Sequence, residues 1–316
     1  MNVKEVFAKP RLVVSRCFFE HTRYDGGIIS DDLIKRLEKY ADFVKVCPEV
    51  EIGLPIPREP IDVFLIDGKI RLLNKTMNAD LTDRMFEFSR KFAQSVSTLG
   101  VDGMILKSKS PSCGLNDAKL YGPNGKVVSK TSGLFAKTML EILTDIPIES
   151  EMRLTNDKLR FEFLSATFTL AKFRNVNNKE ELIKFHASNK LFFMAKNEAL
   201  MRQMGRIIAR KGFKEIKEEY GTILRKLLKT HVKKPRMINA LMHMYGYFKE
   251  KLSIDEKAYF MDLLNRYSTN TVSLQSVLIL LKSWALRFDE KYLLEQTIFE
   301  PYPLELETQH ESREYK

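Results

Sequence analysis

Hydrophobic positions follow two different rhythms along the chain, and the first is typical of an α/β domain. Up to about residue 150, short β-branched runs alternate with stretches of helical spacing. Residues 81–99 have the spacing of an amphipathic helix that ends at Gly100. The expected strands are 11–15, 43–46, 62–66, 69–73 and 103–107, with Asp67-Gly68 as the turn between the third and the fourth. This alternation predicts a Rossmann-like, mostly parallel sheet with helices on both faces.

The second rhythm begins near residue 180, where the strand signals stop. Apolar residues then recur at helical spacing in five stretches with short breaks between them: 180–211, 213–231, 236–251, 254–268 and 272–290. This pattern predicts an all-α bundle after the α/β domain. The expected organisation is an α/β domain at 1–150, a linker containing a helix at 151–178, a helical domain at 179–300 and an acidic tail at 301–316, with the boundary near residue 175.

Basic residues are concentrated in one part of the predicted helical domain. The chain of 316 residues has a formal net charge of +11, and residues 184–236 contain 15 lysines and arginines against 4 acidic residues. A solvated, lysine-rich face is the ordinary interpretation of such a segment. The shortage of compensating acids instead favours a phosphate-rich partner.

Other features restrict the class of protein. No apolar run approaches the roughly 18 residues of a membrane span, and residues 1–10 lack the apolar core of a secretory signal. Three cysteines, an odd number over this length, argue against a disulfide scaffold and for a reducing compartment. We therefore expect a cytoplasmic protein outside the membrane. The oligomeric state stays open.

The three cysteines each follow a predicted strand directly or within its next loop. Cys17 comes two residues after 11–15, Cys47 ends the second strand, and Cys113 lies in the loop after 103–107. Because the carboxyl ends of parallel strands meet in one crevice, we expect the three thiols to converge there.

The spacing alone leaves open what three thiols would bind. A 4Fe–4S cluster held by three thiolates keeps one iron open for a substrate. A zinc site would need a fourth ligand, for which His21 is the nearby histidine. Three inert free cysteines are the third possibility, since the chain has no CxxC pair.

Four motifs around the cysteines resemble a known family. They are Val14-Ser15-Arg16-Cys17, Arg23-Tyr24-Asp25-Gly26-Gly27, Cys47-Pro48-Glu49-Val50 and the run from Lys107 to Gly114 (KSKSPSCG). Together they resemble the thiouracil desulfidase (TudS-like) family over residues 11–145. Residues 185–191 (FHASNKL) and the helix that follows resemble a YbgA-like helical domain. The fusion is similar to RudS-type desulfidases, which remove sulfur from 4-thiouridine in tRNA.

The resemblance implies roles for individual residues. Cys17, Cys47 and Cys113 would hold a 4Fe–4S cluster, and Thr22 stands where relatives often have a further cysteine. Glu49 would serve as acid/base group, although a plain ion pair with Arg58 is the alternative. Ser110 would orient water or the base. The expected substrate contacts are Arg23, Asp25 and Ser112, the last of which would otherwise serve a cluster sulfur.

The helical domain would then bind the RNA that carries the substrate. Arg202, Arg206 and Arg210 recur every four residues and share a helix face. The other expected phosphate contacts are Lys190, Lys214, Lys233 and Lys234.

The expected function is thus an iron–sulfur enzyme that removes sulfur from thiolated uracil, in particular 4-thiouridine in tRNA, by hydrolysis without redox change. One alternative is a desulfidase of free 2- or 4-thiouracil with a structural helical domain. The other is a metal-containing nucleic-acid-binding protein without enzyme activity.

Overall fold

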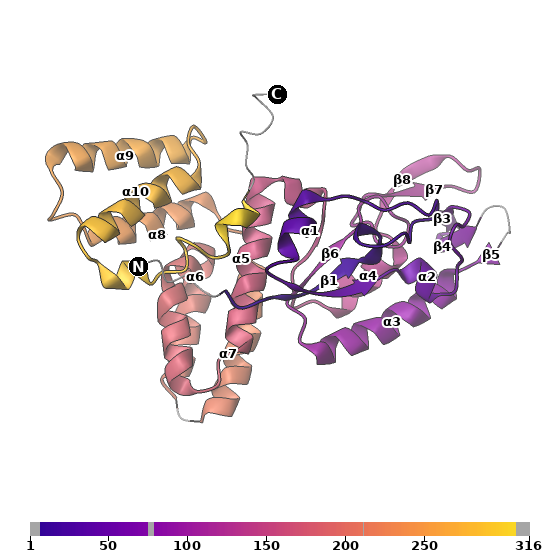
Figure 1. Cartoon of the computed structure of the whole chain (residues 1–316), viewed down its shortest axis with the longest axis horizontal. Helices are drawn as coiled ribbons and strands as arrows, with labels where there is room; N and C mark the ends of the chain where they lie inside the picture. Colours follow the sequence, from indigo (N-terminus) through magenta and orange to yellow (C-terminus); the bar gives the residue numbers. More distant parts are fainter. Residues whose placement is uncertain (1–6, 75–78, 211, 308–316) are drawn as a thin grey trace. The chain divides into compact units, whose positions relative to one another are not determined.

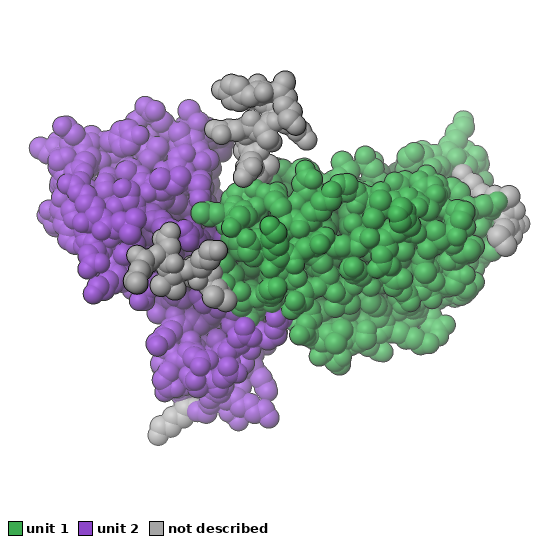
Figure 2. Space-filling view, in the orientation of Figure 1, with its two compact units in different colours: residues 1–171, 303–316 green, residues 172–302 purple. Residues whose placement is uncertain are grey.

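The computed structural model describes residues 7–74, 79–210 and 212–307. The chain divides into two compact units, residues 1–171 with 303–316 and residues 172–302 (Figure 2). The predicted α/β domain followed by an all-α part is confirmed (Figure 1). No helix in the described part of the chain is long and apolar enough to cross a membrane.

A four-stranded parallel sheet forms the centre of unit 1. Its order is β2 (Asp42–Val46), β1 (Arg11–Ser15), β6 (Gly103–Leu106) and β9 (Ile148–Ser150). Every neighbouring pair is parallel. All four strands therefore end at the same edge of the sheet.

Helices cover this sheet because its central strands, β1 and β6, are buried on both faces. Val13, Met104 and Leu106 pack in one core cluster with α3 (Thr82–Leu99) and α4 (Leu134–Ile142). Leu12, Val14 and Ile105 alternate with them and are equally buried. Two more helices of this unit are α1 (Asp32–Leu37) and α5 (Asp157–Arg174), the latter crossing the unit boundary. Gly103 allows α5 to approach, since a Cβ there would lie 2.7 Å from the Thr167 side chain.

A second, five-stranded sheet extends unit 1. β3 (Ile61–Ile66) and β4 (Lys69–Asn74) form the predicted hairpin, with positive φ at both Asp67 and Gly68. β5 (Ala79–Asp80) adds to β4, and β7 (Ala118–Tyr121) pairs with β3 in parallel. β8 (Val127–Thr131) completes the order β5-β4-β3-β7-β8. The hydrophobic pattern did not indicate β7 and β8.

Unit 2 is entirely helical in its described residues. Its helices are α6 (Lys179–Ile208), α7 (Phe213–Leu228), α8 (Lys234–Gly246), α9 (Ile254–Ser268), α10 (Leu274–Arg287) and the short α11 (Lys291–Leu294). α6 is broken at Asn197, where φ is −159° and ψ is 102°. The Arg236 guanidinium donates to the Lys196 carbonyl at 2.8 Å, and the Asn197 side chain accepts from Leu200 N at 3.2 Å, so the break is itself hydrogen-bonded.

Unit 1 consists of two separate stretches of the chain. The units divide between Ala171 and Lys172, inside α5, within the segment 151–178 that the sequence analysis assigns to a linker. Residues 303–307 return to unit 1, where Arg36 of α1 donates to the Glu305 carbonyl at 2.8 Å.

Candidate metal and active site

A cavity of about 530 Å³ lies at the carboxyl end of the parallel sheet, and all three cysteines line it. Cys17 lies in a 3₁₀ turn (Arg16–Phe18) directly after β1. Cys47 links β2 to the short helix α2 (Pro48–Glu51), and Cys113 lies in the loop after β6. The parallel topology thus brings together thiols that are far apart in the sequence.

The Cys113 loop is held by the beginning of α4. Leu134 N donates to the Pro111 carbonyl at 3.0 Å, and Ala136 N donates to the Ser112 carbonyl at 3.0 Å. These backbone N–H groups belong to the first turn of the helix, where no carbonyl of the same helix is available to accept from them. Gly133 N donates to the Gly114 carbonyl at 2.9 Å. The helix therefore fixes the backbone on both sides of Cys113.

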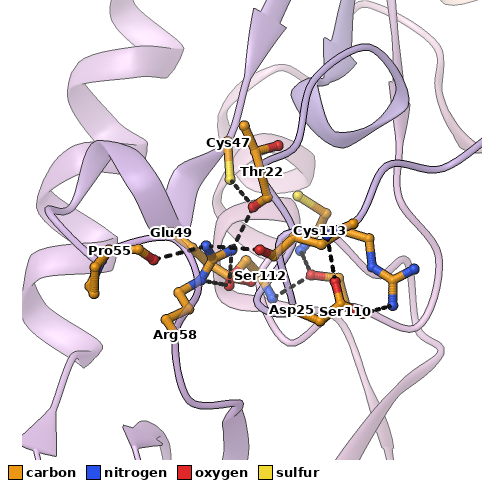
Figure 3. A network of polar contacts seen from close by, with 11 residues as sticks. Thr22, Asp25, Cys47, Glu49, Pro55, Arg58, Ser110, Ser112 and Cys113 are labelled. Carbon is orange, nitrogen blue, oxygen red and sulfur yellow. Dashed lines mark hydrogen bonds and ion pairs between the residues drawn. The ribbon is translucent and has the colours of Figure 1, made fainter.

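Glu49 is a fixed carboxylate that also lines the cavity (Figure 3). Its Oε2 accepts from Arg58 Nε and Nη2, each at 2.8 Å, and its Oε1 accepts from the Ser112 hydroxyl at 2.9 Å. Arg58 also donates to the Thr22 carbonyl at 2.9 Å, and the same carbonyl accepts from Cys47 Sγ at 3.7 Å. The ion pair with Arg58, which the sequence offered as the alternative role of Glu49, is present, and it holds the carboxylate at the cavity.

The two serines of the Cys113 loop have different positions. Ser110 lines the cavity, and its hydroxyl oxygen accepts from the backbone N of Ser112 at 3.2 Å and of Cys113 at 3.1 Å. Ser112 is fully buried and bonded to Glu49, so it supports the carboxylate. Arg23 lines the cavity and forms an ion pair with Asp25 at 3.0 Å; Asp25 does not line the cavity.

Burial raises the pKa of all three cysteine thiols. The pKa of Cys17 is raised to about 12, first by burial and then by the neighbouring Cys47. Burial also raises the pKa of Cys47, and it raises that of Cys113 well above its ordinary value. The thiols are therefore neutral at pH 7 unless a metal takes the place of the protons.

The donor set fits an iron–sulfur cluster better than a zinc ion. In the described residues, no group of three or more His, Cys, Asp and Glu side chains is placed to hold a metal ion. A zinc ion needs its sulfur ligands about 2.3 Å from one centre, whereas a cluster distributes them over several irons. His21, the expected fourth zinc ligand, does not line the cavity and its Nδ1 is bonded to the Gly26 carbonyl at 2.9 Å. The Thr22 hydroxyl, buried in the cavity wall, has no hydrogen-bond partner among the described residues.

Comparisons with known proteins match two different families along the chain. Residues 12–151 match the family described as 2-thiouracil desulfurase, and residues 190–303 match the family described as "Protein of unknown function (DUF1722)". The chain is thus similar to thiouracil desulfurases (TudS-like) in its α/β part and to YbgA-like proteins in its helical part. The sequence resemblance is thereby confirmed.

Individual relatives each match only a part of this chain. The uncharacterised protein YbbK of Bacillus subtilis is 27% identical over 33% of this chain and 72% of its own. The uncharacterised protein YbgA of Escherichia coli is 26% identical over 41% of this chain and 79% of its own. The solved structure of a [4Fe-4S]-dependent thiouracil desulfidase, TudS, is 27% identical and covers 46% of this chain and 94% of that one, with a TM-score of 0.36.

The candidate phosphate contacts of the YbgA-like domain fall into two groups. Lys190, Arg206, Lys214 and Lys233 are exposed, and they form no ion pair with the described residues. Arg202 is exposed and paired with Glu198, and Arg210 with Glu219. Lys234 is different: it donates to the Tyr267 carbonyl at 2.8 Å and to the Ser268 carbonyl at 3.2 Å, at the end of α9. It stabilises the bundle.

Lys107 and Glu151 are further parts of the site that the sequence pattern did not indicate. Lys107 lines the cavity and Glu151 holds it at 2.7 Å. Both directly follow parallel strands, β6 and β9. That position at a strand end is the signal that identified the cysteines. It points to Lys107 after β6, and it would have pointed to Glu151 had β9 been predicted.

Proposed function

We propose that the chain is a desulfidase that removes sulfur from thiolated uracil, specifically from 4-thiouridine in tRNA, with a 4Fe–4S cluster held by Cys17, Cys47 and Cys113. The observation that carries this proposal is the cavity itself. Three thiols from three strand ends share it with a fixed carboxylate, in the part of the chain that matches the 2-thiouracil desulfurase family. A cluster held by three thiolates supplies an open iron, a Lewis acid for the soft thiocarbonyl sulfur.

Glu49 is the group that moves a proton in this proposal. Hydrolysis of a thiocarbonyl forms a carbon–oxygen bond and breaks the carbon–sulfur bond, with no change in oxidation state. The attacking water must lose a proton, and Glu49, a carboxylate that lines the cavity with the three cysteines, accepts it. Arg58 and Ser112 bind its two oxygens, so it is oriented before the substrate arrives.

Ser110 and Arg23 are positioned to orient the base. The Ser110 oxygen already accepts two backbone N–H groups, so its own hydrogen is free to be donated toward the cavity. Arg23 lines the same cavity and offers donors to a carbonyl oxygen on the base edge.

The YbgA-like domain supplies the tRNA contacts. Its exposed basic residues suit binding to phosphates without reading of sequence. Bringing a base out of the stack costs a few kcal/mol, and backbone contacts elsewhere on a folded RNA would offset this cost.

The test is anaerobic purification with iron and sulfide quantitation, for the wild type and for Cys113→Ala. We expect about four irons and four sulfides per wild-type chain and loss of both in the variant. The wild type is then assayed on 4-thiouridine-containing tRNA and on free 2- and 4-thiouracil. Turnover of the free bases alone would replace the tRNA substrate with the nucleobase. Stoichiometric zinc, or no metal, would contradict the desulfidase mechanism.

A further inference from the structure

Lys107 is a cation whose position at the cavity is fixed. Its Nζ donates to Glu151 Oε1 at 2.7 Å, to the Ser108 hydroxyl at 2.8 Å and to the Ser108 carbonyl at 2.9 Å. These three acceptors use the three N–H bonds of the ammonium group. Its backbone N donates to the Ser15 hydroxyl at 2.9 Å, two residues before Cys17. Lys107 therefore acts on its surroundings through its charge.

Glu151 is held just as firmly by Ser108. Its Oε1 accepts from the Ser108 hydroxyl at 2.6 Å and its Oε2 from Ser108 N at 2.8 Å. Glu151 is 8% exposed and does not line the cavity, whereas Lys107 and Cys17 both do. Of the two charges, the positive one thus belongs to the residue that lines the cavity together with the thiols.

The Lys107–Glu151 pair is largely withdrawn from solvent, with 25% and 8% of the two side chains exposed. A buried ion pair is weak evidence for stability, because desolvation of its charges offsets their attraction. The place of Lys107 on the cavity wall needs another explanation.

We propose that Lys107 provides the fixed positive charge that stabilises the hydrosulfide anion left in the cavity after sulfur is removed, an inference that rests on the proposed desulfidase function. In the reaction, the electron pairs of the carbon–sulfur bond leave with sulfur. One proton of the attacking water is transferred to the sulfur and the other passes to a base, so the product is the hydrosulfide monoanion. The neutral thiolated base lacks this charge, and Lys107 therefore favours the product over the substrate.

The experiment titrates sodium sulfide into the anaerobically purified, cluster-loaded protein and follows the visible absorption of the cluster. Lys107→Met keeps the length of the side chain and removes its charge, so we expect hydrosulfide to bind roughly ten-fold more weakly. Glu151→Gln removes the opposing charge, so we expect tighter binding. Lys119→Met, at an exposed position of β7 outside the cavity, is the matched control and should bind as the wild type does.

The opposite signs of the two variants separate an effect of charge from structural damage. Weaker binding in Lys107→Met and tighter binding in Glu151→Gln, each with wild-type iron content, would support the proposal. Unchanged binding in Lys107→Met, or weaker binding in both variants, would overturn it. A wild type that carries no cluster and desulfurates nothing would overturn the proposed function and this inference with it. A wild type with normal turnover and a Lys107→Met variant with normal sulfide affinity would overturn this inference alone.

Discussion

Gly133 lies where a methyl group has no room, and replacing it by Ala should disrupt the Cys113 loop. A Cβ at this position would be 2.4 Å from the carbonyl carbon of Ser112, 2.5 Å from its oxygen and 2.8 Å from Cys113 N. All three are backbone atoms, which have no alternative rotamer to adopt. Since non-bonded carbon atoms normally approach to about 3.5 Å, the loop must move away from α4 by about 1 Å.

The cost follows from the contacts that this movement disturbs. Overpacking of a filled site costs about 1–3 kcal/mol. The shift also stretches the hydrogen bonds that Gly133, Leu134 and Ala136 donate to the loop, each worth about 1 kcal/mol. We expect Gly133→Ala to lower the free energy of unfolding of unit 1 by about 2–4 kcal/mol. A metal ligand tolerates displacements of only about 0.2 Å, so the iron content should fall as well.

Urea unfolding followed by circular dichroism and iron quantitation after anaerobic reconstitution measure these two effects. The only tryptophan, Trp284, belongs to unit 2, so its fluorescence does not report on this change. Gly246→Ala is the control, because a Cβ at Gly246 meets no atom within 4 Å and φ is not positive there. A Gly133→Ala protein with wild-type iron content and an unchanged urea midpoint would refute the reasoning.

Three further predictions concern contacts elsewhere. Arg58→Ala leaves the largely buried Glu49 carboxylate without its cationic partner and should lower the free energy of unfolding by about 2–3 kcal/mol. Arg58→Lys keeps the positive charge and should lower the free energy of unfolding by less. Equal decreases for the two variants in urea unfolding would argue against a stabilising ion pair. Burial, and secondarily the Lys190 ammonium, lower the pKa of His186 from 6.5 to about 4. Between pH 6.5 and 4 the unfolded chain therefore binds more protons than the folded chain does. Lowering the pH from 7.5 to 5 should thus reduce the stability of the wild type by about 2 kcal/mol more than that of His186→Gln. Urea unfolding curves, followed by tryptophan fluorescence, that shift equally with pH in both proteins would contradict this. Lys234→Met should lower the free energy of unfolding and leave the affinity for RNA unchanged. Lys190→Met should leave the free energy of unfolding unchanged and reduce the slope of log K for tRNA against log salt concentration by about one. Urea unfolding and filter binding at several salt concentrations test the two variants.

Three of the four strands of the parallel sheet could be predicted because they carry a local signal. β1 is RLVVS, and the four residues after Arg11 are all buried. The expected limits of β2 and β6 lie within one residue of those in the structure. The end of α3 could be predicted as well, because Gly100 follows its last helical residue. In the structure Gly100 adopts the left-handed conformation, with a φ of 63°.

The missed elements depend on partners far away in the sequence. β8 is exposed at four of its five positions and has no apolar face to recognise. β9 is only three residues long and is stabilised by pairing with β6. The break in α6 has no proline or glycine to mark it, and Arg236 from another helix stabilises it. Tertiary contacts override local pattern in each case.

One part of the candidate site depends on a bound cluster, and another part does not. The thiols of Cys17, Cys47 and Cys113 have raised pKa values, so the protein without a cluster holds them protonated. The bonds from Arg58 and Ser112 to Glu49 involve none of these sulfurs, and the carboxylate keeps its position whether or not a cluster is bound. Loss of the cluster should therefore abolish the chemistry and leave the acid/base group in place. This separation is what allows the wild type and a cysteine variant to be compared in the same fold.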